Sequence, residues 1–307
     1  MRKEFSSRAL PKKSAWGVFI FAGIPPKERR ILMNVQEALK KAEKRLAAVP
    51  DPRLDAEYLL AHTLKMPRLD LLMEKQRELT PGEEAAFEAL AARREKREPL
   101  QYILGTQPFM GFSFKTDPRA LIPRNDTEIL CEEALRHLKA GQRVFDLCTG
   151  SGALAIAVKK LCPGAEVTAS DISPDALSLA RENAAALGAD VRFLQGDLFF
   201  PVSGERFDMI LCNPPYIPDP LRGRLQEEIG WEPARALFAG EDGLLFYRRI
   251  AREAPELLNP GGYLILEIGD DQFEAVKALL APSFLGITLL RDMNGRPRCV
   301  RAERKTP

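Results

Sequence analysis

A four-residue run, Asn213-Pro-Pro-Tyr216, has the side chains needed to hold a flat nitrogen group. The two prolines restrict their own φ angles and push the asparagine into an extended conformation, so the loop is stiff. The Asn213 amide oxygen and the Pro214 carbonyl can then accept the two hydrogens of an NH2 group, and Tyr216 can stack on a planar substrate. Such acceptors favour the positive charge that develops on an attacking nitrogen. An ordinary asparagine–proline turn is the alternative interpretation.

A glycine-rich turn and a later acidic residue predict a nucleotide-like ligand. The run Asp146-Leu-Cys-Thr-Gly-Ser-Gly152 lies between an apolar run and a helical pattern, which is where α/β folds bind such ligands. Asp171 follows Gly150 by 21 residues, and its carboxylate can accept hydrogen bonds from both hydroxyls of a ribose. Leu198 follows a further apolar run, where an adenine ring would rest. These features fit a nicotinamide cofactor and a methyl donor equally, and the P-loop pattern is missing.

The Asn-Pro-Pro-Tyr run distinguishes between these two ligands. A nicotinamide enzyme has no use for paired acceptors at the end of a strand, whereas a methyltransferase acting on a planar nitrogen does. We therefore expect S-adenosylmethionine as the methyl donor, and an amide or amine nitrogen as the acceptor.

From Gly141 onward, short apolar runs alternate with helical patterns, which predicts a doubly wound parallel α/β sheet. We expect strands at residues 144–147, 166–170, 191–195, 209–212, 263–267, 287–290 and 299–302. We expect helices from Asn125 or Asp126 through Leu138, at 153–161, after a Ser173 cap, and at 243–258. The turn at Asn294-Gly295 predicts that the last two strands form a hairpin.

Residues 34–98 have the pattern of a small all-helical domain. Both Asn34 and Thr80 are followed three positions later by a glutamate, as in a capping box. Further helices are expected after Pro52 and near Pro67.

The segments on either side of this domain are less regular. Residues 99–124 mix aromatics with glycines and prolines, which predicts short strands. We interpret them either as a hairpin-like interdomain linker or as a hairpin that contacts substrate. Residues 1–33 are interpreted as a non-native or disordered extension ahead of a start at Met33, because the helix signal begins at Asn34. A signal peptide is the less favoured alternative.

Several segments resemble the release factor glutamine methyltransferases, a family within the class I methyltransferases. The glycine turn, Asp171 and Asn213–Tyr216 are common to planar-nitrogen methyltransferases, including enzymes of DNA adenine and ribosomal RNA guanine. The narrower resemblance is carried by Pro99–Gly105, Leu121–Glu128, Glu232-Pro233 and Gly240–Gly243, and it covers about residues 34–303. It implies a seven-stranded Rossmann-like domain at 125–307, preceded by the small all-α domain at 34–98.

The resemblance also implies roles for individual residues. It implies that S-adenosylmethionine is bound by Asp146, Cys148, Thr149, Gly150, Ser151, Gly152, Asp171, Leu198 and Asn213. It implies that the glutamine of a release factor's Gly-Gly-Gln motif is held by Asn213, Pro214, Pro215 and Tyr216, with Asn213, Pro214 and Tyr216 as the catalytic residues. Two positions depart from the family pattern. Cys148 stands where many members have glycine, and Leu198 where some have tryptophan, which puts donor affinity in doubt.

Composition narrows the classes of protein that remain. Eight basic and two acidic side chains lie in residues 1–33, whereas residues 100–307 carry 24 basic and 28 acidic side chains, a net charge of −4. Direct binding of nucleic acid to this acidic region is therefore not expected. Five scattered cysteines without a C-x-x-C pair predict a reduced, cytoplasmic protein, and two isolated histidines predict no metal site. The apolar stretch 15–24 is too short to span a bilayer, so no membrane partner is expected.

Two related activities remain as alternatives to release factor methylation. A ribosomal protein L3 glutamine methyltransferase has a similar domain plan and the same Asn-Pro-Pro-Tyr loop, but the run Ile122–Glu128 resembles the release factor branch. A nucleic-acid exocyclic-amine methyltransferase is disfavoured by the acidic charge. A non-enzymatic binding protein is disfavoured because every expected site residue is present.

Overall fold

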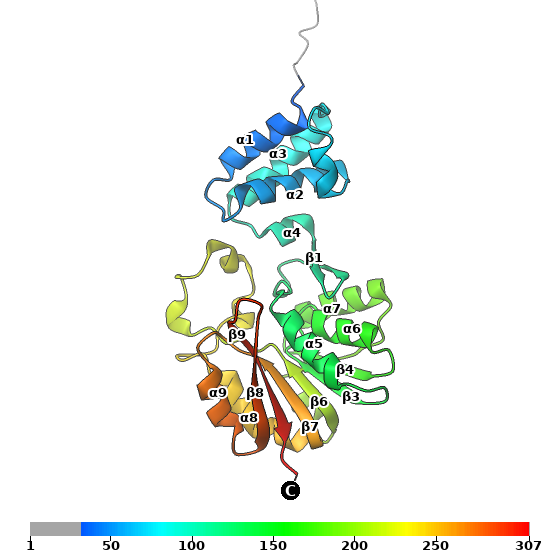
Figure 1. Cartoon of the computed structure of the whole chain (residues 1–307), viewed down its shortest axis with the longest axis vertical. Coiled ribbons are helices and arrows are strands. Elements are labelled where there is room, and N and C mark those ends of the chain that lie inside the picture. The colour runs from blue at the N-terminus through cyan, green and yellow to red at the C-terminus, as the bar shows by residue number, and fades with distance from the viewer. Residues whose placement is uncertain (1–31, 307) are drawn as a thin grey trace, which may run out of the picture.

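The computed structural model describes residues 32–306 as a small helical domain and a larger α/β domain joined by a linker (Figure 1). The interpretation of residues 1–33 as an extension lies outside the described residues, apart from Leu32 and Met33.

The helical domain begins where the capping signals predict. Its elements are α1 (Val35–Arg45), α2 (Pro52–Leu64), the short 3-10 helix η1 (Arg68–Leu72) and α3 (Pro81–Glu95). The Asn34 side chain accepts a hydrogen bond from the Glu37 amide at 2.9 Å, and Thr80 accepts one from the Glu83 amide at 3.2 Å, which confirms both capping boxes. The helix expected near Pro67 is only the single turn of η1.

The linker contains a short helix that the sequence reading missed, followed by the predicted strands. Its elements are α4 (Leu100–Leu104), β1 (Thr106–Phe109) and β2 (Phe112–Lys115), and the two strands pair antiparallel. Ile103 packs into the core of the helical domain, whereas Phe109 and Phe114 pack into the core of the α/β domain. Residues of this segment therefore pack on both neighbouring domains.

The α/β domain is built on a seven-stranded sheet, as predicted. Its strands are β3 (Arg143–Leu147), β4 (Glu166–Asp171), β5 (Arg192–Gln195), β6 (Phe207–Cys212), β7 (Leu258–Glu267), β8 (Phe284–Arg291) and β9 (Pro297–Arg304). The order is β5-β4-β3-β6-β7-β9-β8, and the first five strands are parallel. The β8–β9 hairpin adds the two strands at the other edge, with β9 antiparallel to both of its neighbours.

Helices cover both faces of this sheet and complete two apolar cores. One core includes residues of α5 (Thr127–His137), α6 (Ala153–Leu161) and α7 (Pro174–Leu187). The other includes residues of α8 (Leu245–Leu257) and α9 (Phe273–Leu280), the second of which the sequence reading did not predict. The remaining 3-10 turns are η2 (Phe200–Val202), η3 (Asp219–Leu221), η4 (Glu227–Trp231) and η5 (Ala234–Ala236).

The expected side-chain cap of α5 is wrong. Asp126 precedes this helix but makes no capping hydrogen bond, because its carboxylate lies 3.3 Å from the Arg298 guanidinium. The Asn125 side chain instead accepts a hydrogen bond from Gln107 at 3.3 Å. The first turn is closed by backbone bonds to Arg124, Asn125 and Asp126.

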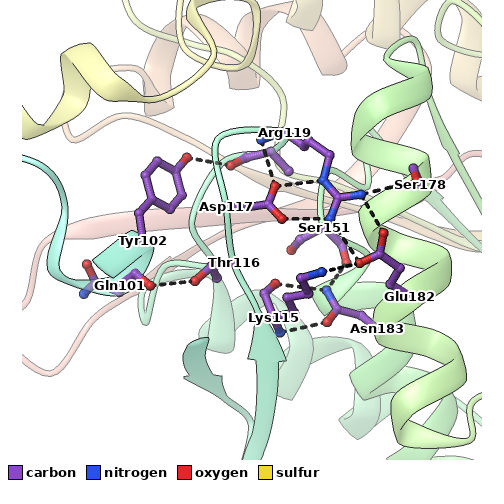
Figure 2. A network of polar contacts seen from close by, with 11 residues as sticks. Gln101, Tyr102, Lys115, Thr116, Asp117, Arg119, Ser151, Ser178, Glu182 and Asn183 are labelled. Atoms are coloured by element: carbon purple, nitrogen blue, oxygen red, sulfur yellow. Dashed lines mark hydrogen bonds and ion pairs between the residues drawn. The ribbon is translucent and has the colours of Figure 1, made fainter. Parts of the chain in front are cut away.

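A buried asparagine on α7 connects the linker to the glycine turn. Figure 2 shows Asn183 between Lys115 of β2 and Ser151. Its side-chain oxygen accepts from the Lys115 amide at 2.8 Å, and its NH2 group donates to the Lys115 and Ser151 carbonyls at 3.2 and 3.0 Å. Close to Asn183, the Arg119 guanidinium donates hydrogen bonds to Asp117 and Glu182. The linker is therefore attached to the same turn that is expected to bind the donor.

Candidate active site

The glycine turn leaves β3 and enters α6 with three residues in the left-handed region. Cys148, Gly150 and Gly152 have φ values of +61°, +55° and +80°. A Cβ on Gly152 would lie 3.0 Å from the Ala180 Cβ, so close packing and the positive φ both disfavour a larger residue there. A Cβ on Gly150 would meet no atom within 4 Å, so this part of the turn faces open space.

Asp146 and Thr149 hold the turn in shape. The Thr149 hydroxyl donates to the Asp146 carboxylate at 2.5 Å, and the Ala155 amide donates to the same oxygen at 3.2 Å. Burial raises the pKa of the Asp146 carboxyl to about 7. Both residues line a small cavity of about 60 Å³ rather than the larger pocket described below.

Asp171 lies at the carboxyl end of β4 and connects the turn to the next helix. Its two carboxylate oxygens accept hydrogen bonds from the amides of Gly150 at 2.9 Å and Ser173 at 2.8 Å. Each oxygen keeps a further lone pair for a ligand hydroxyl. Burial raises the pKa of this carboxyl, and the two backbone bonds oppose that rise.

Gly150, Asp171 and Ser173 line a pocket of about 740 Å³ at the carboxyl ends of the parallel strands. Of the residues expected at the donor and substrate sites, it is lined by Cys148, Gly150, Asp171, Leu198, Asn213 and Pro215. Leu198 is buried with a φ of +45°. Ser170 also lines the pocket, but its hydroxyl is buried and makes no hydrogen bond to any described residue. A volume between about 300 and 1,000 Å³ is usual for a small-ligand site.

The Asn213–Tyr216 loop follows β6, and a hydrogen bond orients the Asn213 side chain. The Asn213 NH2 group donates to the Thr127 hydroxyl at 3.1 Å, and its amide oxygen accepts no hydrogen bond from the described residues. Gln272 donates to the Tyr216 carbonyl at 3.0 Å. A Cβ on Gly243 would lie 2.4 Å from that carbonyl oxygen, so only glycine fits beside the loop.

A second pocket of about 420 Å³ adjoins the same loop. Asn213, Pro214 and Tyr216 line it on the α/β side, with residues such as Asp55 and Arg94 on the helical-domain side. Asn213, Leu121 and Ala236 line both pockets.

Glu267, at the end of β7, is a site residue that the sequence reading missed. Its carboxylate is buried and accepts hydrogen bonds from the Thr127 hydroxyl at 2.6 Å and the Tyr216 hydroxyl at 3.3 Å. Burial raises the pKa of this carboxyl to about 7. An acidic residue at the end of a predicted strand, as at Asp171, is the signal that would have identified it.

Two of the motifs behind the family resemblance contact each other. The buried Glu232 carboxylate accepts a hydrogen bond from the Ile122 amide at 3.0 Å and pairs with the Arg124 guanidinium. This contact holds the segment before α5 against the chain between β6 and α8, and both segments line the second pocket.

The same β6–α8 chain also contacts the helical domain. Arg94 of α3 is 4% exposed and pairs with Asp55 at 2.7 Å and with Glu228 of η4 at 2.9 Å. Arg97 adds a contact to Glu228 at 2.6 Å. Figure 1 shows this chain, in yellow-green, rising beside α4 toward the helical domain.

Two other kinds of site are absent from the described part of the chain. Between residues 32 and 306, no three histidine, cysteine or acidic side chains lie close enough together to hold a metal ion. No helix in the same range is long and apolar enough to cross a bilayer.

The chain is similar to known families and to curated relatives. Residues 37–105 match the family model described as the PrmC N-terminal domain, and residues 125–230 match the one described as the methyltransferase small domain. The chain is 46% identical to the release factor glutamine methyltransferase of Geobacter sulfurreducens, over 82% of this chain and 89% of the relative. It is 42% identical to that of Deinococcus radiodurans, over 89% of this chain and 99% of the relative.

A solved structure supports the fold alone. A methyltransferase from Pyrococcus furiosus superposes with a TM-score of 0.50 at 19% identity, over 64% of this chain and 90% of that one.

Proposed function

Because the chain belongs to the release factor glutamine methyltransferase family, we propose that it methylates a glutamine side chain in peptide chain release factors. The methyl donor is S-adenosylmethionine, and the acceptor is the amide nitrogen of the glutamine in the Gly-Gly-Gln motif. The observation that carries the proposal is the Asn213 side chain, which lines both pockets and whose amide oxygen accepts no hydrogen bond from the described residues.

The larger pocket has the groups that a nucleoside sulfonium needs. The Asp171 carboxylate has free lone pairs for the ribose hydroxyls. The open side of Gly150 allows close approach to the backbone. Leu198 and Pro215 provide apolar contacts for an adenine ring.

When bound, S-adenosylmethionine supplies an electrophilic methyl group on a positively charged sulfur. The glutamine nitrogen forms the new N–C bond with its electron pair while sulfur keeps the electrons of the broken S–C bond. Asn213 and the Pro214 carbonyl accept the NH2 hydrogens, which stabilises the positive charge developing on nitrogen. One of these hydrogens then leaves to water as a proton.

The second pocket suits a protein loop better than a nucleic acid. Its lining includes the carboxylates of Asp51, Asp55, Glu228, Glu232 and Glu267, and only two arginines. Phosphate groups would be repelled by such a surface. An extended glutamine side chain flanked by glycines can enter it and reach Asn213 without a bulky neighbour.

The proposal is tested by incubating the purified chain with methyl-labelled donor and a release factor. Asn213→Ala should lower the single-turnover rate by roughly a hundredfold or more, the scale seen when one preorganised polar group facing developing charge is removed. Donor affinity, measured by calorimetry, should fall much less, because the Asn213 contact strengthens in the transition state.

Matched controls distinguish this chemistry from a general loss of structure. Asn294→Ala, at an exposed turn between β8 and β9, should leave the rate unchanged. Ribosomal protein L3 and duplex DNA serve as alternative substrates. Preferential labelling of either one, or a near-normal rate for Asn213→Ala on release factor, would refute the proposal.

A further inference from the structure

A chain of two hydrogen bonds connects the Asn213 amide to a buried carboxylate. Asn213 donates to the Thr127 hydroxyl at 3.1 Å, and that hydroxyl donates to Glu267 at 2.6 Å. The Tyr216 hydroxyl donates to the other oxygen of the same carboxylate at 3.3 Å. Thr127 and Glu267 belong to α5 and β7, so residues up to 140 positions apart meet behind the Asn213–Tyr216 loop.

The direction of these bonds follows from the chemistry of each group. An ionised carboxylate only accepts hydrogen bonds, and a threonine hydroxyl has one hydrogen to donate. Once Thr127 gives that hydrogen to Glu267, its oxygen can only accept. The Asn213 side chain must therefore present its NH2 group to Thr127, which leaves its oxygen for the pocket.

We propose that Thr127 and ionised Glu267 are positioning residues that select the reactive orientation of the Asn213 amide. This inference rests on the proposed methylation of a glutamine amide. In the opposite orientation, Asn213 would present hydrogens to the NH2 group of the substrate, and the acceptor needed as nitrogen becomes positive would be lost. Neither positioning residue has to touch the reacting atoms.

Protonation of Glu267 allows the direction of hydrogen-bond donation along this chain to reverse. A neutral carboxyl can donate to Thr127, whose hydrogen is then free to point at the Asn213 oxygen and occupy it. Burial raises the pKa of Glu267 to about 7, whereas its bonds from Thr127 and Tyr216 lower it. The other titratable or charged groups facing it are Arg124, Asp126, Cys212, Tyr247 and Cys299. Low pH should therefore disfavour the reactive orientation.

The first test compares two substitutions of one residue on release factor under single-turnover conditions. Thr127→Val keeps the shape but removes the hydroxyl, and should lower the rate by roughly tenfold, less than removal of Asn213 itself. Thr127→Ser keeps the hydroxyl and should stay within about twofold to threefold of the unsubstituted chain. Donor affinity should be the same in both variants. Equal rates for the valine and serine variants would overturn the inference.

The second test is the pH profile of the rate at saturating donor. The rate should rise through about pH 7 as Glu267 ionises. Tyr216→Phe keeps the ring but removes a bond that lowers the Glu267 pKa, so the rise should move to higher pH. Asp146→Asn is the matched control, because the Asp146 pKa is also about 7. A rise that disappears in Asp146→Asn and does not move in Tyr216→Phe would overturn the inference.

The two tests separate this inference from the proposed function. If the unsubstituted chain transfers no methyl to release factor, the proposed function fails. If it does transfer and Thr127→Val reacts at the full rate, only the positioning role fails. If Thr127→Val does not fold, the pH profiles of the unsubstituted chain, Tyr216→Phe and Asp146→Asn decide alone.

Discussion

Replacing Asn183 by alanine should both destabilise the α/β domain and weaken donor binding. Asn183 is 2% exposed and makes three hydrogen bonds to the backbone of Lys115 and Ser151. At about 0.5–1.5 kcal/mol for each bond, the free energy of unfolding should fall by roughly 2–4 kcal/mol. Tm falls by about 2–4 °C per kcal/mol in a domain of this size. Donor affinity should drop because the freed Ser151 carbonyl belongs to the glycine turn.

The measurement is a thermal melt of each variant together with a calorimetric titration of S-adenosylmethionine. Glu182→Ala is the matched control, since Glu182 is the adjacent residue of α7 and its ion pairs with Lys115 and Arg119 are solvent-exposed (Figure 2). Exposed pairs contribute little to stability, so this variant should melt close to the unsubstituted chain. Equal melting temperatures for the two variants would refute the positioning of the turn by Asn183.

Two further predictions concern the donor pocket. Asp171→Ala should weaken S-adenosylmethionine binding by about 1.5–3 kcal/mol. It should also lower Tm, because the Gly150 and Ser173 amides lose their acceptor. Unchanged affinity by calorimetry would exclude a ribose contact. Cys148→Gly should leave the free energy of unfolding unchanged or raise it by up to about 1 kcal/mol, since φ is +61° there. Cys148→Val should lower the free energy of unfolding. If chemical denaturation shows the valine variant to be more stable than the glycine variant, this reasoning is wrong.

Local patterns predicted those elements whose structure is determined by neighbouring residues. The capping boxes at Asn34 and Thr80 join groups three positions apart, so the sequence alone locates the starts of α1 and α3. The glycine turn and the Asn-Pro-Pro-Tyr loop are likewise defined by backbone restrictions that a short run of residues carries. The positive φ at Cys148 is likewise a local property of the turn, and it is a conformation that glycine adopts most easily.

The residues that orient these local elements could not be identified in the same way. Asn183 and Thr127 act through partners 32 to 140 positions away, and nothing in their own neighbourhoods marks them as polar contacts rather than exposed side chains. Glu267 is marked only by its place at the end of a predicted strand, which does not reveal its partners. The failed prediction at Asp126 has the same origin. Its sequence position suits a helix cap, but the distant Arg298 competes for the carboxylate.

The position of the helical domain depends on a buried ion-pair cluster rather than on the linker alone. Arg94 joins Asp55 of its own domain to Glu228, which lies in the chain between β6 and α8. Buried charge pairs contribute little net stability but strongly penalise arrangements that leave one charge unpaired. That chain carries Glu232 as well, which holds the segment before α5. The walls of the second pocket are thus positioned together, because displacing the helical domain would leave Glu228 without its buried partner.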